Sequence, residues 1–222
     1  MRIGIFDSGR GGEFVAADLR LLLPEHEYIV VNDREHVPYG SRTDDDIIAL
    51  TTIAIQPLIL NHCPVIIIAC NTATMAAISS LRLRYPTITF IGIEPMVKPA
   101  GALSKSGHIT VLATPLTLRS KRYRQLKKLF THQLHIDEPD TSGWAAAIET
   151  HEPDTIDLSV VTSSVSQGSD TVVLACTHYH TLVERLRASL PNSVNILEPT
   201  PAIARQLSRV VTELRAQRGD EV

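Results

Sequence analysis

An apolar segment that ends in Ala-Cys occurs twice in the chain, and this duplication restricts the possible folds more than any other feature. The first copy spans residues 65–72 (VIIIACNT) and the second spans residues 171–178 (TVVLACTH). In each copy an apolar run of strand length gives way to small polar residues, which is typical of a buried parallel strand that ends at a site. The two cysteines, Cys70 and Cys176, stand 106 residues apart.

The strand-like segments that precede these two copies repeat at the same offset. Residues 3–8 (IGIFDS) and 109–114 (ITVLAT) both end in a hydroxyl residue, and Ser8 and Thr114 are again 106 positions apart. The pattern predicts an α/β fold of two pseudo-symmetric lobes, each with a mainly parallel sheet flanked by helices. Open parallel sheets bind ligands at the carboxyl ends of their strands, so each lobe should deliver one cysteine to a cleft between them.

The lobes are expected to meet in a turn-rich stretch, and 222 residues suffice for two small domains. We predict a first lobe of residues 1–97 plus 200–222, because the last helix, about 201–217, should return to pack on it. The second lobe is then 98–199. Proline and glycine cluster at the junction, at Pro95, Pro99, Gly101 and Gly107.

Composition argues against several classes of protein. The net charge is −3, and the one basic run, from Arg119 to Lys128, is expected to be the solvated face of a helix lying over Leu118, Leu126 and Leu129. It lacks the interleaved aromatic residues of a nucleic-acid site. Three cysteines without CxxC spacing indicate reduced thiols, and no apolar run reaches the ~18 residues of a membrane span. We expect a cytoplasmic protein, with a homodimer among the alternatives for its assembly.

Two thiols that face one cleft suit the inversion of a carbon that carries a hydrogen. Such a reaction needs a base on one face and an acid on the other. Cysteine, with a pKa of about 8.5, can supply a thiolate and a thiol near neutrality. Asp7 could assist Cys70, and His178 could assist Cys176. The alternative is that both cysteines are small apolar residues at the ends of buried strands, which their matched offset makes less attractive.

Two other interpretations stay open at this point. The glycine-rich turn at residues 8–12 could bind a phosphate or a carboxylate through its backbone amides, and Asp7 could simply shape that turn. Cys176, His178 and His180 alternate, so an extended segment would present all three to a zinc ion.

Several motifs, taken together and in order, resemble the glutamate racemases of the cofactor-independent aspartate/glutamate racemase superfamily. They are Asp7-Ser8-Gly9 with Gly11-Gly12, Asp33 with Val37-Pro38-Tyr39-Gly40, Ala69-Cys70-Asn71-Thr72-Ala73, Gly92-Ile93-Glu94-Pro95, Thr114 with Thr117, and Cys176-Thr177-His178-Tyr179.

The resemblance implies interconversion of L- and D-glutamate for the synthesis of cell-wall peptidoglycan, with no pyridoxal phosphate and no metal. It implies that Cys70 and Cys176 are the acid and base, assisted by Asp7 and His178. Glu149 is the best match for a glutamate that supports the second cysteine. The implied substrate contacts are Asp7, Ser8, Pro38, Tyr39, Gly40, Asn71, Thr72, Thr114, Thr117, Thr177 and His178.

The chain also departs from the family pattern. It is short around residues 131–155, and Arg34 and His180 replace a small residue and a proline beside the expected site. An aspartate racemase, or a racemase for another amino acid, is therefore one alternative. A degenerate, non-catalytic ligand-binding or regulatory homologue is another.

Overall fold

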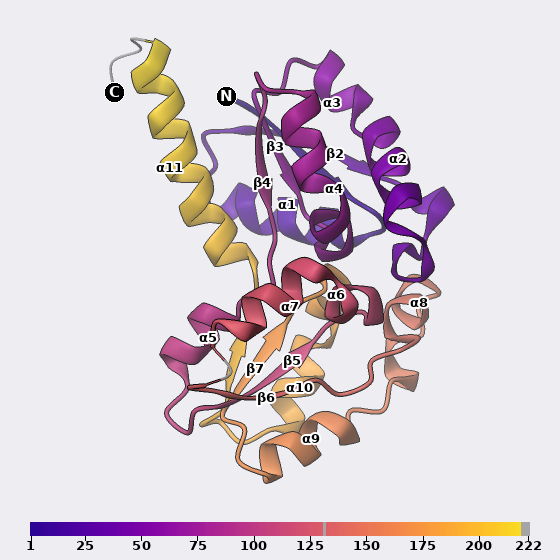
Figure 1. Cartoon of the computed structure of the whole chain (residues 1–222), viewed down its shortest axis with the longest axis vertical. Helices are drawn as coiled ribbons and strands as arrows, with labels where there is room; N and C mark the ends of the chain where they lie inside the picture. The colour runs from indigo at the N-terminus through magenta and orange to yellow at the C-terminus, as the bar shows by residue number, and fades with distance from the viewer. Residues whose placement is uncertain (131, 219–222) are drawn as a thin grey trace.

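The protein folds into two lobes, each built on a four-stranded parallel sheet (Figure 1). This computed structural model describes residues 1–130 and 132–218. The strand order is β2-β1-β3-β4 in the first sheet and β6-β5-β7-β8 in the second, which is the same topology twice. The predicted two-lobed α/β fold is confirmed.

The first lobe alternates strands and helices along the chain. Its elements are β1 (Arg2–Asp7), α1 (Gly11–Leu22), β2 (Glu27–Asn32), η1 (Arg34–His36), η2 (Tyr39–Ser41), α2 (Asp44–Ala54), α3 (Gln56–Leu60), β3 (Val65–Ile68), α4 (Asn71–Arg84) and β4 (Thr89–Gly92), where η marks a 3₁₀ helix.

The second lobe repeats the pattern with shorter helices. Its elements are α5 (Val97–Leu103), β5 (His108–Leu112), α6 (Pro115–Arg119), α7 (Lys121–Lys128), β6 (His135–Asp137), α8 (Trp144–Glu149), η3 (Pro153–Thr155), α9 (Ser159–Ser166), β7 (Thr171–Leu174), η4 (Thr177–Leu182), α10 (Val183–Ser189) and β8 (Asn195–Leu197), followed by α11 (Thr200–Arg218).

The duplication extends to the register of the strands. Ile3 pairs with Val65 in the first sheet, and Ile109 pairs with Thr171 in the second, each shifted by the same 106 residues. The next pairs, Val65 with Thr89 and Thr171 with Asn195, keep that shift. The strands before Cys70 and Cys176 therefore hold equivalent positions in their sheets.

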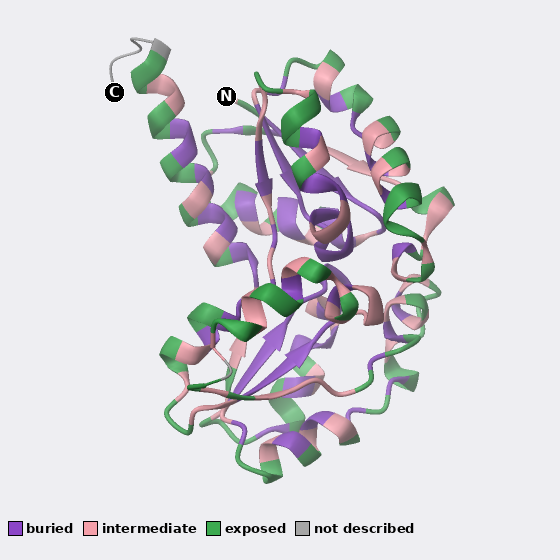
Figure 2. Cartoon of the chain, in the orientation of Figure 1, coloured by how far each residue is buried: buried purple, intermediate pink, exposed green. Residues whose placement is uncertain are grey.

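Apolar side chains fill both faces of each sheet, as an all-parallel sheet requires. The central strands β3 and β7 are buried along their whole length (Figure 2). Helix α11 comes after the second lobe but packs on the first: Ile203, Leu207 and Val211 share a core with Ile3 and Ile5.

Whether the lobe boundaries fall at 97/98 and 199/200 remains a prediction, and residues 219–222 lie outside the described residues. Limited proteolysis would test these boundaries.

Helix α5 packs into the core of the second lobe, because Val97 and Ala100 contact the apolar residues of β5 and β7. In the part of the chain that the structure describes, no helix is both long and apolar enough to cross a membrane.

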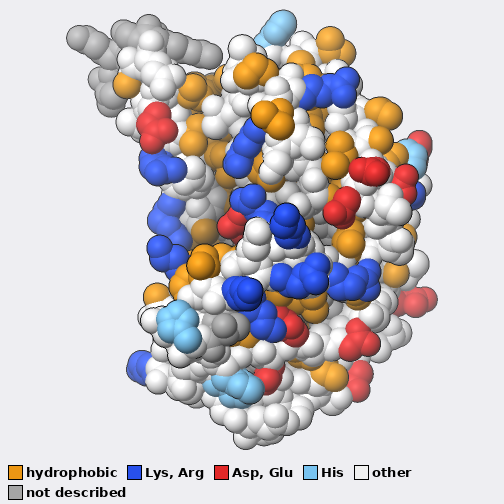
Figure 3. Space-filling view, viewed as in Figure 1, with side chains coloured by type: hydrophobic (Ala, Val, Ile, Leu, Met, Phe, Trp, Pro, Cys, Tyr) orange, Lys and Arg blue, Asp and Glu red, His pale blue; other side chains and the backbone are white. Residues whose placement is uncertain are grey.

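The helical segment of residues 44–60 is divided into α2 and α3, because Pro57 has no N–H to continue the helical hydrogen bonds. Helix α9 begins at Ser159, after the 3₁₀ turn η3. One local expectation was wrong. Leu129, expected beneath the basic helix, is 65% exposed. Lys and Arg side chains do form a row over the solvent face of α7 (Figure 3).

The edge strand β6 was not predicted at all. It is three residues long, it begins and ends with a polar residue, and it pairs only with β5, so its apolar pattern is too short to recognise. Thr131, at the start of the region where the chain is short for the family, lies outside the described residues.

Candidate active site

A cavity of about 210 Å³ lies between the lobes, where the carboxyl ends of the two sheets meet. Both Cys70 and Cys176 line it, each two residues beyond the end of its strand. The predicted site residues that also line it are Ser8, Pro38, Tyr39, Gly40, Asn71, Thr72, Thr114, Thr177 and His178. Asp7, Thr117 and Glu149 lie behind this first layer, in contact with residues that belong to it.

Cys70 occupies the N-cap of α4, which explains how its sulfur is held. Its Sγ accepts a hydrogen bond from the backbone N–H of Ala73 at 3.4 Å and lies 3.2 Å from the Ser8 Oγ. Burial, followed by the charge of Asp7, raises the pKa of the Cys70 thiol to about 12, although the bonds from Ser8 and Ala73 act to lower it. The charge of Cys176 is a further raising cause, so the two sulfurs lie close enough to influence each other. At neutral pH Cys70 is therefore a thiol.

Cys176 has a different partner. The Nδ1 atom of His178 lies 3.7 Å from its Sγ, and the Nε2 atom of His178 lies 2.5 Å from the Oε1 atom of Glu149. Burial acts to lower the pKa of His178, but its contacts with Cys176 and Glu149 raise the pKa well above the usual range. His178 is therefore a cation in contact with Cys176.

Glu149 is held as a carboxylate by both lobes. Burial acts to raise its pKa, but hydrogen bonds from His178 and from the backbone N–H of Arg10 outweigh that effect and lower it. The Arg10 N–H donates to Oε1 at 2.8 Å. One anion at the glycine-rich turn is thus a side chain of the protein's own second lobe, which accepts a hydrogen bond from the backbone N–H of Arg10.

The glycines of that turn permit this close approach. A Cβ atom on Gly9 would lie 2.1 Å from the Glu149 Oε1 and 2.6 Å from the His178 Nε2. A Cβ atom on Gly11 would lie 2.2 Å from the Thr177 Oγ1. Glycine is needed at both positions so that the second lobe can pack against the turn.

Hydroxyl and carboxylate groups connect the lobes around the cavity. Thr177 donates a hydrogen bond of 2.9 Å to Asp7, whose side chain is fully buried and also accepts from the Gly9 N–H. On the other side, the Oγ1 of Thr72 lies 3.0 Å from that of Thr114, which donates to Thr117.

Tyr39 is one of the residues that the first lobe brings to the cavity through residues 38–40. Its hydroxyl donates to Asp33 at 2.7 Å, which holds the ring, and the peptide bond between Val37 and Pro38 is cis. Asn71 has both polar atoms of its amide buried without a hydrogen-bond partner in the described part of the chain. A buried amide of this kind is unfavourable unless a ligand satisfies it.

The sequence analysis missed several cavity residues. The loop before α8 and the first turns of that helix contribute Thr141, Ser142, Gly143, Ala145 and Ala146, and η4 contributes Tyr179. The Tyr179 hydroxyl donates to Thr141 at 2.9 Å and so fixes this loop. The sequence offers one signal for this segment, because Gly143 stands directly before the apolar patch that begins at Trp144. This pattern indicates where a helix starts, but it does not indicate which side of the helix faces the cavity.

The zinc interpretation of Cys176, His178 and His180 is wrong. Cys176 and His178 are in contact, but the 3₁₀ helix η4 begins at Thr177, so His180 does not lie on the same face as in an extended segment. His180 instead pairs with Glu198 at 2.5 Å and packs its ring against Phe14.

The sequence profile of one family, described as Asp/Glu/Hydantoin racemase, matches residues 15–207. The chain belongs to this family. Among the racemases that it resembles is the glutamate racemase of Roseiflexus sp. (strain RS-1), with 38% identity over 216 residues, which cover 95% of this chain and 79% of that protein. The glutamate racemase of Ectopseudomonas mendocina is 37% identical over 214 residues, covering 94% and 81%.

Solved racemase structures share the fold. The crystal structure of Escherichia coli glutamate racemase in complex with L-glutamate and the activator UDP-MurNAc-ala superposes with a TM-score of 0.80 and 28% identity, covering 93% of this chain and 80% of that one. The prediction of a racemase from the aspartate/glutamate superfamily is confirmed.

Proposed function

We propose that this protein interconverts L- and D-glutamate without a cofactor, by moving the Cα proton between Cys70 and Cys176. The observation that carries the proposal is that both thiols, from equivalent strand ends in separate lobes, line the same cavity. The glutamate racemases that share 37% and 38% of their residues with this chain support the choice of substrate.

The surroundings of the thiols suggest their starting roles. Cys176, beside the His178 imidazolium, is the base that accepts the proton from Cα. Cys70, whose pKa burial raises to about 12, is the acid that donates a proton to the opposite face of the carbanion. The Cα–H bond breaks toward one sulfur and a new Cα–H bond forms from the other, so the carbon is inverted and no redox change occurs. In the reverse direction the two thiols exchange roles.

The residues behind the cavity hold this arrangement. Glu149 keeps His178 protonated and oriented toward Cys176. Asp7 raises the pKa of Cys70 through its charge, which keeps that thiol protonated, and it accepts the hydrogen bond of Thr177. Both are positioning residues, because neither lines the cavity.

The polar lining supplies contacts for a small amino acid. The unpartnered amide of Asn71 can both donate to and accept from the substrate. The backbone N–H groups at the start of α4 favour a carboxylate. The hydroxyls of Ser8 and Thr72 are further hydrogen-bonding groups in the lining. Those of Thr114 and Thr177 already donate to Thr117 and Asp7, so they can act only as acceptors. Pro38, Tyr39 and Gly40 enclose the substrate, while Thr117 orients Thr114.

The cellular role follows from the reaction. We assign the product, D-glutamate, to the synthesis of peptidoglycan and the protein to the cytoplasm, where its three free cysteines would stay reduced. The homodimer stays a prediction, which light scattering would test.

Exchange of the Cα hydrogen with deuterated solvent tests the proposal. The wild-type protein should exchange the Cα hydrogen of both glutamate enantiomers, and a panel that includes aspartate should exchange far more slowly. A faster exchange of aspartate would identify an aspartate racemase. Binding of glutamate without any exchange would identify a non-catalytic homologue.

Cys63→Ser is the matched control for the two thiols. Cys63 is equally buried, but it packs in a core of the first lobe and does not line the cavity. This variant should racemise glutamate as the wild type does, whereas Cys70→Ser and Cys176→Ser should not. Full racemisation by either of these two variants would contradict a two-thiol mechanism.

A further inference from the structure

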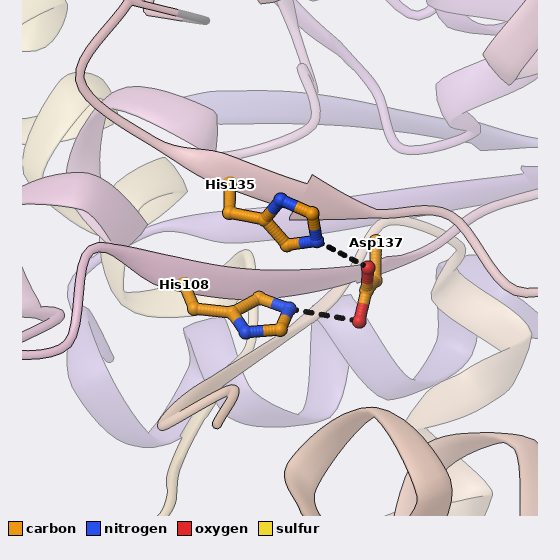
Figure 4. Close-up of side chains that lie close together, drawn as sticks. All are labelled: His108, His135 and Asp137. Atoms are coloured by element: carbon orange, nitrogen blue, oxygen red, sulfur yellow. Dashed lines mark hydrogen bonds and ion pairs between the residues drawn. The ribbon is translucent and has the colours of Figure 1, made fainter. Parts of the chain in front are cut away.

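Two histidines and an aspartate meet on the second sheet, at the end remote from the active site. His108 begins β5, His135 begins the short strand β6, and Asp137 ends it (Figure 4). The active-site cavity lies at the carboxyl ends of the sheets. His108 and His135 are register partners, and Asp137 is two residues beyond His135. All three side chains therefore project from one face of the sheet.

The donor atoms converge. The His108 Nε2 lies 2.8 Å from the Asp137 Oδ2, and the His135 Nε2 lies 3.1 Å from the Oδ1. The ligand atoms of all three residues lie within 4.8 Å of one another. A tetrahedral zinc ion with ligand distances of about 2.0–2.1 Å separates its ligands by roughly 3.3 Å, so small side-chain rotations would bring the three donors onto one ion.

We propose that His108, His135 and Asp137 form a binding site for a divalent transition-metal ion of the zinc type, with water completing the coordination. Two imidazoles and one carboxylate are borderline ligands that suit zinc better than magnesium or calcium, which prefer oxygen alone. The proposal does not depend on the proposed racemase activity. It departs from the sequence-based expectation that the chain binds no metal.

The burial of the three groups fits an open site at the surface. The side chains of His108 and Asp137 are 12% and 22% exposed, so the sheet holds them in place, whereas that of His135 is 69% exposed. The exposed ring leaves room for water on the metal and can adjust its position. The sequence alone did not predict this site, because β6, the strand that aligns His135 with His108, was not recognisable from its residues.

The consequence of metal binding would be structural. Strand β6 is the edge of the second sheet and pairs only with β5. A metal ion would connect the two strands at the point where they begin. Because it would bind the folded lobe and not the unfolded chain, it would raise the stability of that lobe in proportion to the logarithm of its concentration.

Zinc binding to the full-length chain tests the proposal, in a parent protein that carries Cys70→Ser and Cys176→Ser so that the active-site thiols cannot compete. We compare this parent with versions that also carry His135→Ala or His132→Ala. His132 is exposed and lies three residues before His135, so it is the matched control. Titration calorimetry with zinc chloride measures the affinity, and circular dichroism checks that each version is folded.

The parent and the His132→Ala version should bind one zinc ion per chain, and His135→Ala should weaken the affinity at least tenfold, as the loss of a ligand requires. Zinc should raise the melting temperature of the first two and not of the third. The proposal is overturned if the parent binds no zinc, or if His135→Ala binds zinc as tightly as His132→Ala does.

Discussion

The two cysteines occupy equivalent positions in the two lobes, but the groups around them are not equivalent. Cys70 caps a helix and contacts the neutral hydroxyl of Ser8, and the negative charge of Asp7 raises its pKa. Cys176 precedes a 3₁₀ helix and contacts His178, which Glu149 holds as a cation. The comparison shows that duplication of the backbone fixes where two thiols lie, whereas their unlike neighbours give the two sulfurs different electrostatic surroundings.

Replacing either thiol should lower the racemase activity more than any other change. Cys70→Ser and Cys176→Ser should each lower kcat for glutamate racemisation by about 10²–10⁴, the usual contribution of a general acid or base. Each variant should still eliminate the leaving group from a β-substituted analogue of one enantiomer, because abstraction of the proton needs only one thiol. The rate at which each enantiomer of the analogue forms its α-keto acid product measures this. If both variants prefer the same enantiomer, the thiols do not serve opposite faces.

Gly9→Ala should separate the second thiol from its supporting groups. The new Cβ atom would lie 2.1 Å from Glu149 and 2.6 Å from His178, so the lobes have to shift apart. A displacement of about 1 Å at the reacting groups should lower kcat about a hundredfold. A kcat of Gly9→Ala equal to that of the wild type would argue against close packing of the lobes at Gly9.

Glu149→Gln should make the neighbours of Cys176 more like those of Cys70. Loss of the charged hydrogen bond, worth about 2 kcal/mol, should lower kcat about thirtyfold. Without the carboxylate, the pKa of His178 should fall, which an NMR titration of the imidazole measures. Glu152→Gln, an exposed change in the same segment, should alter neither quantity. An unchanged His178 titration in Glu149→Gln would exclude this pairing.

Glu149→Gln should also change how the free energy of unfolding depends on pH. The pKa of His178 is raised in the folded protein, so its stabilising contribution is complete below the unfolded pKa of about 6.5 and is lost as the pH rises through the folded pKa. Glu149→Gln should move this loss of stability to lower pH. Urea denaturation at several pH values would detect the shift.

Asn71→Ala should have the smallest effect and should act on substrate binding alone. Its amide has no hydrogen-bond partner within the described chain, so removing it should leave the free energy of unfolding nearly unchanged. KM for glutamate should rise about fivefold, corresponding to one hydrogen bond of about 1 kcal/mol. A clear loss of stability without a change in KM would assign the amide a structural role instead.

The sequence predicted the parts of the molecule that repeat. Strands β3 and β7 were recognisable because they are continuous apolar runs, and the cysteines after them both line the cavity. Strand β6 and the Thr141–Ala146 part of the cavity have no counterpart in that pattern. A three-residue edge strand and a loop that tertiary contacts position leave no periodic signal. His180 was misjudged because alternation predicts a shared face only in an extended segment.

The hydrogen bonds between the lobes have a consequence for how firmly the lobes are joined. Asp7 is bonded to Thr177, and Thr72 lies within bonding distance of Thr114. Separating the lobes would break both contacts. Water would replace each bond, so the net free energy of separation is only about 1 kcal/mol per bond. Contacts of this kind therefore align the two halves of the cavity without locking them together.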